Sequence, residues 1–243
     1  MSMREAVNFD EVHSVYSWPR RVLRLLLPNV CLVCAEAGTA DGDLCPWCRA
    51  ALPAHGRACL CCATPLSASD EALLCGQCLQ HRPPLQHVHA CFTYHWPVDG
   101  LLRRFKFRQD LAAGRLLSEL MVKACAGLPR PQALVPVSLH RQRLRQRGYD
   151  QALELARPLG RALRLPCLPL LRRVRATAPQ SELDAAERQR NLRGAFVAGG
   201  ALPAHVALVD DVMTTGATLH AAAQALHRAG VQRVDAWVCA RVP

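Results

Sequence analysis

The sequence predicts an α/β protein in which a small N-terminal zinc-ribbon module precedes a mostly parallel, twisted sheet with flanking helices. Two observations carry this prediction. Short apolar runs such as Val206–Val209 fit strands buried on both faces, as parallel strands are, and helical patterns follow them. Paired cysteines gather near the start of the chain, where four C-x-x-C motifs lie between Cys31 and Cys78. A length of 243 residues accommodates one mid-sized domain and a small one.

Residues 1–30 are expected to form an N-terminal lead helix. Val22, Leu23, Leu25 and Leu26 give it an amphipathic pattern, and Pro28 ends it. No run of the chain approaches the roughly 18 apolar residues of a membrane span. The first residues carry acids and lack the apolar stretch of a signal peptide. We therefore expect a cytoplasmic protein with no membrane span.

Residues 31–82 are predicted to form a double zinc ribbon. Two sets of four cysteines have the spacing of tetrahedral zinc sites: Cys31, Cys34, Cys45 and Cys48, and then Cys59, Cys62, Cys75 and Cys78. Few core-forming residues lie between them, so bound metal would supply the folding energy. Four thiolates leave no open position, which predicts structural zinc, one or two ions. Ligands shared between the two sets, or a single occupied site, stay as alternatives, and Cys61 is surplus.

Residues 85–243 are expected to form the sheet domain, after a linker at Pro83 and Pro84. Apolar patterns predict strands at 87–96, 134–137 and 234–239, in addition to the run at 206–209. Helices are expected at 101–107, 114–125 and 151–165, and Pro158 should kink or break the last of these. The remaining cysteines lie in apolar surroundings and are expected to be ordinary buried thiols: Cys91, Cys125, Cys167 and Cys239.

The most informative stretch is Val206–Thr218, V-A-L-V-D-D-V-M-T-T-G-A-T. It predicts a strand that ends at Asp210 and Asp211, then a turn of hydroxyls and glycine, then a helix. The N–H groups at a helix N-terminus bind phosphate, whereas carboxylates repel it. The acidic pair therefore indicates a ligand that also carries hydroxyls or Mg²⁺, such as a ribose 5-phosphate unit. The plainer alternative is a buried strand with an Asp-capped turn, and no Walker or dinucleotide motif is present.

Positive charge is concentrated in one part of the chain, whose formal net charge is +11. Residues 131–200 hold thirteen arginines and five acids, a net of 13 − 5 = +8, whereas residues 31–84 hold three basic and five acidic residues, a net of −2. This clustering predicts a polyanionic ligand, either pyrophosphate-bearing or a nucleic acid. Arginines between Arg141 and Arg193 are expected to bind single-stranded DNA weakly, because no aromatic ladder accompanies them. The charged segment 172–196 is a candidate lid, and solvated arginine-rich surface is the alternative.

Several motifs carry a resemblance to known proteins. Val206–Thr218 resembles the phosphoribosyl pyrophosphate (PRPP) motif of type I phosphoribosyltransferases. Together with V-P-V-S-L-H, R-L-R-Q-R-G-Y-D-Q and E-R-x-x-N-x-R-G-A-F behind a cysteine-rich start, it makes the chain similar to the ComF family over nearly its whole length. Ser138, where the family usually has proline, and Pro158 are small departures. The resemblance implies the type I phosphoribosyltransferase fold and a role in DNA uptake during natural transformation, or in the use of DNA as a nutrient.

The resemblance also implies roles for individual residues. Asp210 and Asp211 would bind the ribose hydroxyls, directly or through water on Mg²⁺. The 5-phosphate would lie in the turn formed by Thr214, Thr215, Gly216, Ala217 and Thr218. Arg147 and Arg175 would face the pyrophosphate. No catalytic residue follows from the motif, and the acceptor substrate is not evident.

Two hypotheses on function follow. The first is a PRPP-binding phosphoribosyltransferase, an enzyme of pentosyl transfer acting in DNA uptake or in the use of DNA-derived nucleotides, with Mg²⁺ accompanying PRPP. The second is a non-catalytic adaptor that binds a nucleotide or single-stranded DNA and docks a partner, such as the uptake helicase, through its zinc module. An enzyme needs a pocket for the acceptor base and a positioned acid or base, and the sequence identifies neither.

Overall fold

A computed structural model describes residues 30–39, 42–67, 72–175, 192 and 194–243. The chain divides into two compact units, Met1–Ala50 and Ala51–Pro243. The lead helix predicted for residues 1–30 lies outside the described residues, apart from Val30, as does most of the candidate lid. The boundaries predicted at 31–82 and 85–243 stay predictions. The second cysteine set lies in the same compact unit as the sheet.

In the first unit, the described part is a small cysteine-rich ribbon. Antiparallel bridges join Val30 to Ala37 and Thr39 to Gly42. The short helix α2 (Pro46–Ala50) follows the second pair of cysteines. Leu44 and Cys48 have no exposed surface, so the interior of this ribbon consists mainly of cysteine sulfur and one leucine.

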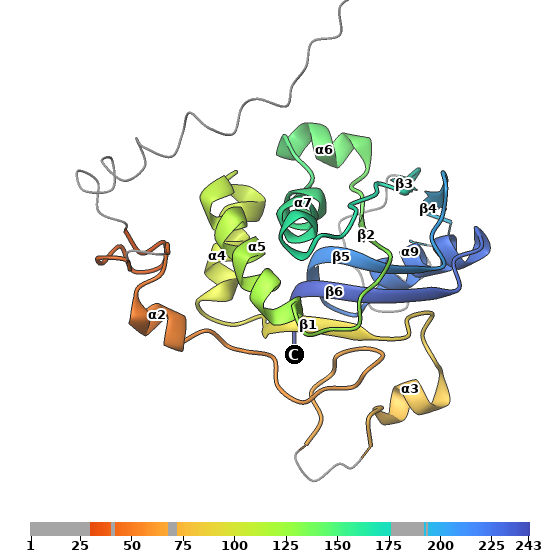
Figure 1. The fold of residues 1–243 in the computed structure, drawn as a ribbon, viewed down its shortest axis with the longest axis horizontal. Helices are drawn as coiled ribbons and strands as arrows, with labels where there is room; N and C mark the ends of the chain where they lie inside the picture. Colours follow the sequence, from red (N-terminus) through yellow and green to blue (C-terminus); the bar gives the residue numbers. More distant parts are fainter. Residues whose placement is uncertain (1–29, 40–41, 68–71, 176–191, 193) are drawn as a thin grey trace, which may run out of the picture. The chain divides into compact units, whose positions relative to one another are not determined.

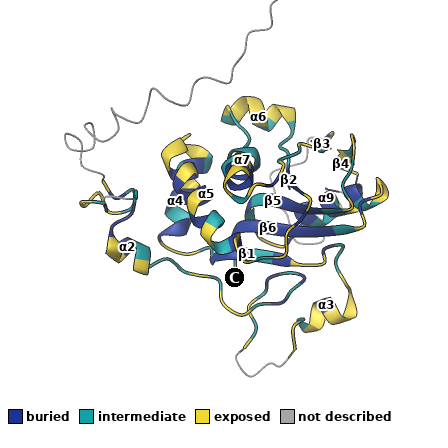
Figure 2. Cartoon of the chain, in the orientation of Figure 1, coloured by how far each residue is buried: buried dark blue, intermediate teal, exposed yellow. Residues whose placement is uncertain are grey.

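The larger unit is built on a four-stranded parallel sheet, which confirms the predicted fold class (Figure 1). Its order is β1 (Val88–Thr93), β6 (Arg233–Arg241), β5 (His205–Met213) and β2 (Ala133–Pro136). Each neighbouring pair runs parallel. The strands are dark blue in Figure 2, because most of their residues are buried. This burial on both faces is the reason that these segments read as continuous apolar runs.

Helices cover the sheet on both sides. Contacts join α4 (Val98–Phe107) to α5 (Leu111–Cys125), α5 to α7 (Gln151–Leu163), α5 to β1 and β6, and α7 to β5 and β2. The helix α9 (Ala217–Arg228) contacts β5 and β6, together with a small antiparallel pair, β3 (Leu171–Arg173) and β4 (Phe196–Ala198). Ala222 and Leu226 of α9 share one buried cluster with Val206 and Leu208 of β5.

Three local features differ from the sequence predictions. The strand β5 does not end at the acidic pair but continues to Met213, because β6 pairs with it that far whereas β2 stops opposite Val209. The helix α7 is not broken at Pro158. Its buried face, which includes Leu155 and Leu159, offsets the roughly 3 kcal/mol that an internal proline costs. An additional helix, α6 (Arg141–Arg147), follows β2.

The second ribbon packs directly on the sheet. It contains the short helix α3 (Gly76–Gln80). The Val88 N–H donates to the Leu60 carbonyl at 2.6 Å, and the Arg241 Nε donates to the Cys62 carbonyl at 3.2 Å. These bonds join the ribbon to β1 and to the end of β6. Among the described residues, no helix is both long enough and apolar enough to cross a membrane.

Candidate functional site

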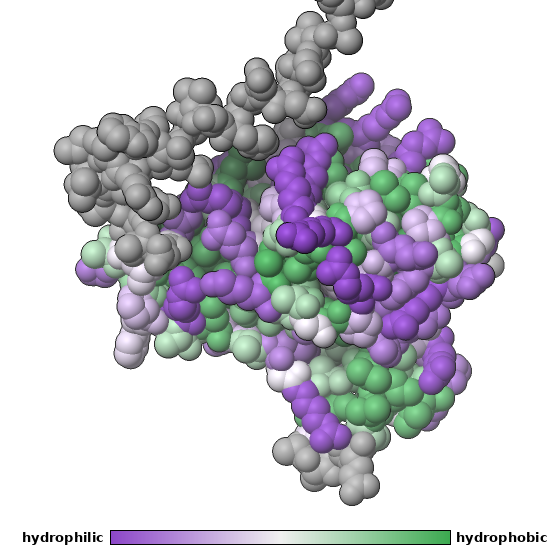
Figure 3. All heavy atoms as spheres, viewed as in Figure 1, coloured by the Kyte–Doolittle hydropathy of each residue, from purple (hydrophilic) through white to green (hydrophobic). Residues whose placement is uncertain are grey.

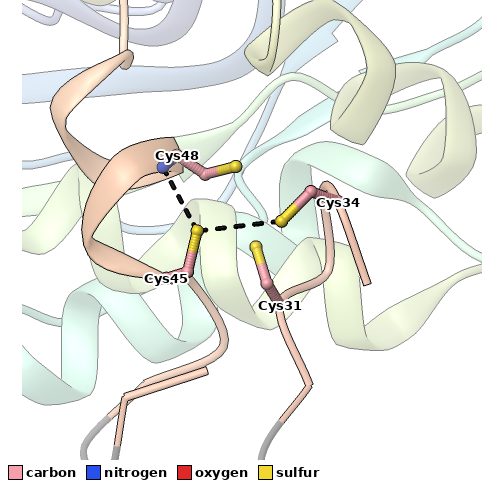
Figure 4. A group of neighbouring side chains, drawn as sticks. All are labelled: Cys31, Cys34, Cys45 and Cys48. Atoms are coloured by element: carbon pink, nitrogen blue, oxygen red, sulfur yellow. Dashed lines mark hydrogen bonds between the residues drawn. The ribbon is translucent and has the colours of Figure 1, made fainter. Parts of the chain in front are cut away.

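The structure gathers the eight predicted zinc ligands into two separate groups. In each group the four sulfur atoms lie within 4.8 Å of one another, and the groups are Cys31, Cys34, Cys45 and Cys48 (Figure 4) and Cys59, Cys62, Cys75 and Cys78. The Cys34–Cys45 and Cys62–Cys75 sulfurs are 3.7 and 3.6 Å apart. Sulfurs bonded to zinc at about 2.3 Å in a tetrahedron lie about 3.8 Å apart. Both groups therefore fit structural zinc, and neither shares a ligand with the other.

Backbone groups favour the thiolate form at the first cysteine of each group. Burial opposes ionisation of Cys31, but N–H groups of Cys34, Cys45 and Val33 lower its pKa to about 6. Burial likewise opposes ionisation of Cys59, yet N–H groups of Cys75, Cys61 and Cys62 lower its pKa to about 7. The thiolate is the form that binds metal, so Cys31 and Cys59 are the ligands of their groups that ionise most readily. Burial, followed by neighbouring cysteine side chains, raises the pKa of Cys48 and of Cys78 in the same groups.

Five cysteines lie outside the two groups. Cys61 is buried and its thiol donates to the Gln86 carbonyl at 3.6 Å. Cys91, Cys125 and Cys239 are buried as predicted, whereas Cys167 is only half-buried. The Cys91 and Cys125 sulfurs lie 3.9 Å apart, and His89 lies close to both. These side chains pack in the interior between β1 and α5.

The acidic pair lies on β5, beyond the end of β2. Asp211 is 6% exposed, and its Oδ2 lies 2.8 Å from the Nζ of Lys106 on α4. Its Oδ1 accepts the Val212 N–H at 2.8 Å, and the Asp210 Oδ1 accepts the Asp211 N–H at 2.8 Å. Both oxygens of Asp211 are thus engaged within the chain, and Lys106 is its counter-ion.

The two carboxyls have opposite pKa shifts. Burial, followed by the charge of Asp211, raises the pKa of Asp210 well above its ordinary value. Burial also opposes the ionisation of Asp211, but the Lys106 ammonium outweighs it and holds the pKa of Asp211 below its ordinary value. The pair therefore holds one firm negative charge, and the second carboxyl ionises less readily.

The turn that follows presents hydroxyls and backbone N–H groups. Thr214 and Thr215 are exposed. Gly216 has φ +77°, and a Cβ at this position would lie 2.6 Å from the Met213 side chain. The helix α9 begins at Ala217, so its unpaired N–H groups face the turn. This turn has the glycine and the helix N-terminus that a phosphate site requires.

A small pocket of about 120 Å³ lies beside the acidic pair. Basic side chains from three elements line it: Lys106 of α4, Arg143 and Arg147 of α6, and Arg173 of β3. Asp150, Asp210, Asp211 and Thr218 also line it. Arg143 and Arg147 are one helical turn apart, so α6 turns them to the same side. Arg175, predicted to face the pyrophosphate, is exposed and does not line this pocket.

Crowding of cations makes the pocket attractive to anions. Burial, followed by the charge of Arg143, lowers the pKa of Arg173 to about 10. Burial, followed by the charge of Arg147, lowers the pKa of Arg143 as well. Buried like charges repel one another, and a bound polyanion would relieve that repulsion. The region of α6 is hydrophilic in Figure 3. Arg141 and Arg145 of this helix are exposed.

Contacts between α4 and the segment after α6 fix the position of Lys106. The Phe105 and Tyr149 rings lie 5.3 Å apart, and the Tyr149 hydroxyl donates to the Phe105 carbonyl. The Arg147 guanidinium lies 5.8 Å from the centre of the Phe107 ring. Asp150 accepts the Leu139 N–H at 2.9 Å, which holds the loop after β2 against α7. The contacts of Phe105 and Phe107 therefore hold the residues on both sides of Lys106 in place beside the pocket.

Sequence reasoning did not assign three of the four basic residues of this pocket: Lys106, Arg143 and Arg173. Lys106 is one of only two lysines in the chain, which is a weak signal. Arg143 belongs to the same arginine run as Arg147, and a helical reading of that run would have paired the two. Arg173 gave no signal, because its approach to the pocket depends on the pairing of β3 with β4.

The fold and the site together define an α/β protein with a zinc-ribbon module and a pocket lined by basic side chains at the carboxyl ends of its parallel strands. Comparison with known proteins agrees with the cysteine geometry. Residues 22–79 match the family described as "Double zinc ribbon domain".

Relatives cover most of the chain. "DNA utilization protein YhgH" of Salmonella typhi is 37% identical over 225 residues, which is 88% of this chain and 90% of the relative. "Competence protein F" of Haemophilus influenzae is 36% identical over 177 residues, 68% of this chain and 77% of the relative. "Competence protein ComFC" of Bacillus subtilis is 30% identical over 148 residues, 60% of each chain. The chain belongs to the ComF family.

Proposed function

We propose that this protein binds PRPP at the carboxyl end of β5 and acts as a phosphoribosyltransferase in DNA uptake or in the use of DNA-derived nucleotides. One observation carries the proposal. The acidic pair, the phosphate turn and four basic side chains meet at one edge of the parallel sheet, where open α/β sheets bind their ligands. The names of the relatives, which refer to competence and to DNA utilization, support the biological role.

In this proposal each part of the site binds one part of PRPP. Asp210 and Asp211 accept hydrogen bonds from the ribose diol, and the turn from Thr214 to Thr218 donates to the 5-phosphate. Arg143 and Arg147 face the pyrophosphate, and the buried Arg173 adds charge behind them. Carboxylate oxygens are ligands that Mg²⁺ prefers, so Asp210 and Asp211 also fit a magnesium ion accompanying PRPP, which neutralises the diphosphate when bound.

Transfer of a phosphoribosyl group develops positive charge at C1 of the ribose and negative charge on the leaving pyrophosphate. Residues of the pocket would interact with both of these developing charges. The guanidinium groups would stabilise the growing negative charge, and Asp211, which lines the same pocket, would hold the ribose. Holding the diol and both phosphate ends at once also fixes the ribose between them. The protein would thus contribute position and electrostatic stabilisation.

In this proposal, Lys106 changes its partner when the ligand binds. Without a ligand it neutralises Asp211 at 2.8 Å. A ribose hydroxyl can reach Asp211 only if Lys106 shares or releases that carboxylate. The released ammonium would lie among the arginines beside the pyrophosphate position. Binding of PRPP would therefore exchange an internal ion pair for two contacts with the ligand.

The test is calorimetric titration of PRPP in the presence and absence of Mg²⁺, followed by PRPP consumption with a panel of nucleobases and with DNA as an additional component. Binding together with release of pyrophosphate in the presence of one acceptor is the expected result. Absence of PRPP binding at any magnesium concentration would refute the proposal.

The adaptor role is a second candidate, favoured by exposed apolar side chains on both ribbons. Trp47 of the first ribbon is 79% exposed, and Leu73 and Leu79 of the second are 61% and 65% exposed. The residues around α3 form a hydrophobic area in Figure 3. Such side chains are typical of surfaces that bind another protein. Intact PRPP binding without consumption across the whole panel would favour this role over catalysis.

A further inference from the structure

A wide cleft of about 1050 Å³ lies within the larger unit, on the other side of the phosphate turn from the small pocket. One wall is the second ribbon, with Gln77 and Gln80 of α3. The opposite wall is α9, with His220 and Gln224, and the turn contributes Thr214 and Thr215 at one end. The cleft therefore begins at the turn and extends along α9.

Its wall is held in place by contacts with the sheet domain. The Arg241 Nε donates to the Cys62 carbonyl, which joins the ribbon to β6. The two ring nitrogens of His227 lie 2.8 Å from the Val231 carbonyl and 3.0 Å from the Pro84 carbonyl. His227 thus holds the linker after the ribbon against α9. The shape of the cleft depends on this fixed placement of the second ribbon.

The charge of the cleft differs from that of the small pocket. Among the described residues that line it there is no aspartate or glutamate, while Arg82 and Arg241 are present. The Nε2 of His220 is buried and has no hydrogen-bond partner in the described part of the chain.

The remaining lining suits nucleotides. Three glutamines and three threonines offer hydrogen bonds, and Pro83, Pro84 and Val242 offer flat apolar surface. Ligand pockets for one small molecule occupy roughly 300–1000 Å³. The cleft is at the upper limit of that range and opens to solvent, so it has room for more than one nucleotide.

We propose that the cleft between the second ribbon and α9 binds a segment of single-stranded nucleic acid, with one of its phosphates at the Thr214–Thr215 turn. The exposed arginines of α6 are then not the principal nucleic-acid surface, in contrast to the sequence prediction. The inference rests on the proposed function for the affinity of the turn for phosphate. It follows that PRPP, whose 5-phosphate takes the same turn, weakens binding of the strand.

The probe is a fluorescein-labelled oligothymidylate of about 12 nucleotides, which spans a typical single-strand site. Its affinity is measured by fluorescence anisotropy at several salt concentrations with the full, zinc-loaded chain. Arg82→Glu and Gln224→Glu each place a negative charge in one wall of the cleft. Arg228→Glu is the matched control, because Arg228 is an exposed residue of α9 that does not line the cleft. Arg145→Glu tests the exposed face of α6.

Arg82→Glu and Gln224→Glu should each weaken binding about tenfold at low salt, and Arg82→Glu should reduce the salt slope by about 0.7 for the phosphate contact that it loses. Arg228→Glu and Arg145→Glu should leave the affinity near that of the unchanged protein. PRPP affinity should stay the same in all four variants, which separates this inference from the proposed function. Zinc content and the thermal midpoint establish that each variant is folded. If the Arg82→Glu protein loses zinc, the oligonucleotide affinity of the Gln224→Glu protein alone tests the proposal.

Two results would overturn the proposal. One is loss of binding in Arg145→Glu with retention in Gln224→Glu, because the strand would then lie on α6. The other is no oligonucleotide binding by the unchanged protein at low salt. If PRPP fails to bind while the oligonucleotide binds and both cleft variants weaken it, the cleft proposal stands and the phosphoribosyltransferase proposal falls.

Discussion

The two sides of the phosphate turn differ in how their charges are arranged. On one side, the small pocket of about 120 Å³ combines four basic side chains with three acidic ones, and Lys106 already pairs with Asp211. On the other side, the cleft of about 1050 Å³ has basic residues and no aspartate or glutamate among its described lining. Paired charges select a ligand that offers both hydroxyls and phosphates. Unpaired cations attract polyanions with little selectivity. The same turn thus borders a small pocket that should be selective for its ligand and a cleft that should bind polyanions with little selectivity.

The largest expected effect tests the selective side. The double change Asp210→Asn, Asp211→Asn should weaken PRPP binding by about 3 kcal/mol, because charged hydrogen bonds to the diol are lost. Inorganic pyrophosphate, which lacks the diol, should bind the variant at least as tightly, because the negative charge of the acidic pair has left a basic pocket. Calorimetric titration of both ligands measures this. Equal PRPP affinity in the two proteins would mean that the acidic pair does not bind the ligand.

Loss of the zinc site in the second ribbon should impair the cleft, whereas loss of the site in the first ribbon should not. Cys78→Ser in the second ribbon should lower the zinc content from two ions to one and abolish oligonucleotide binding, because Cys78 belongs to the wall of the cleft. Cys45→Ser in the first ribbon should lower zinc by the same amount and leave oligonucleotide binding intact. Elemental analysis and anisotropy are the measurements. Intact oligonucleotide binding in a Cys78→Ser protein that has lost its zinc would contradict a role for the ribbon wall.

A smaller effect is expected at Lys106. Lys106→Gln should weaken PRPP binding about tenfold, since one charge-assisted contact with the pyrophosphate disappears. Lys106→Arg should restore much of the affinity. Lys123→Gln is the matched control, because Lys123 is the other lysine of the chain and lies exposed on α5. Tighter PRPP binding in Lys106→Gln would show that Lys106 only competes with the ligand for Asp211.

The smallest expected effect concerns stability and pH. Because the folded pKa of Asp210 is raised, its ionisation destabilises the folded chain as pH increases through that pKa. Asp210→Asn removes this term, so its thermal midpoint at pH 8 should exceed that of the unchanged protein by about 2–4 °C for each kcal/mol gained. The difference should vanish below about pH 4, the ordinary range of the aspartate pKa.

Asp211→Asn should behave in the opposite way. The folded pKa of Asp211 is lowered, so the carboxylate stabilises the fold above its ordinary pKa, and this contribution is lost as pH falls through the folded value. The variant should therefore be less stable than the unchanged protein at neutral pH and equal to it in strong acid. The thermal unfolding of both variants is measured between pH 3 and pH 8. The lower limit is about one unit below the ordinary aspartate pKa, and the upper limit is well above it. Shifts of the same sign in the two would contradict the asymmetry of the pair.

The sequence by itself determined the features that depend on neighbouring residues. Cysteine spacing defined both metal groups, because each knuckle is a local turn that aims two sulfurs at one point. Apolar runs defined the parallel strands, and the order of apolar strand, threonines, glycine and helix defined the turn at Gly216. The fold class and the family followed from these elements. The domain boundaries and the ligand roles of the site residues stay predictions.

Only the tertiary structure decided which charges meet. Lys106 and Asp211 are far apart in the sequence, and Arg173 reaches the pocket from a third segment. Whether an arginine of α6 points inward depends on the packing of that helix, and the cleft exists only because the second ribbon is held against α9 and β6. Coulombic energy depends on distance and burial in space, and residue spacing along the chain contains neither.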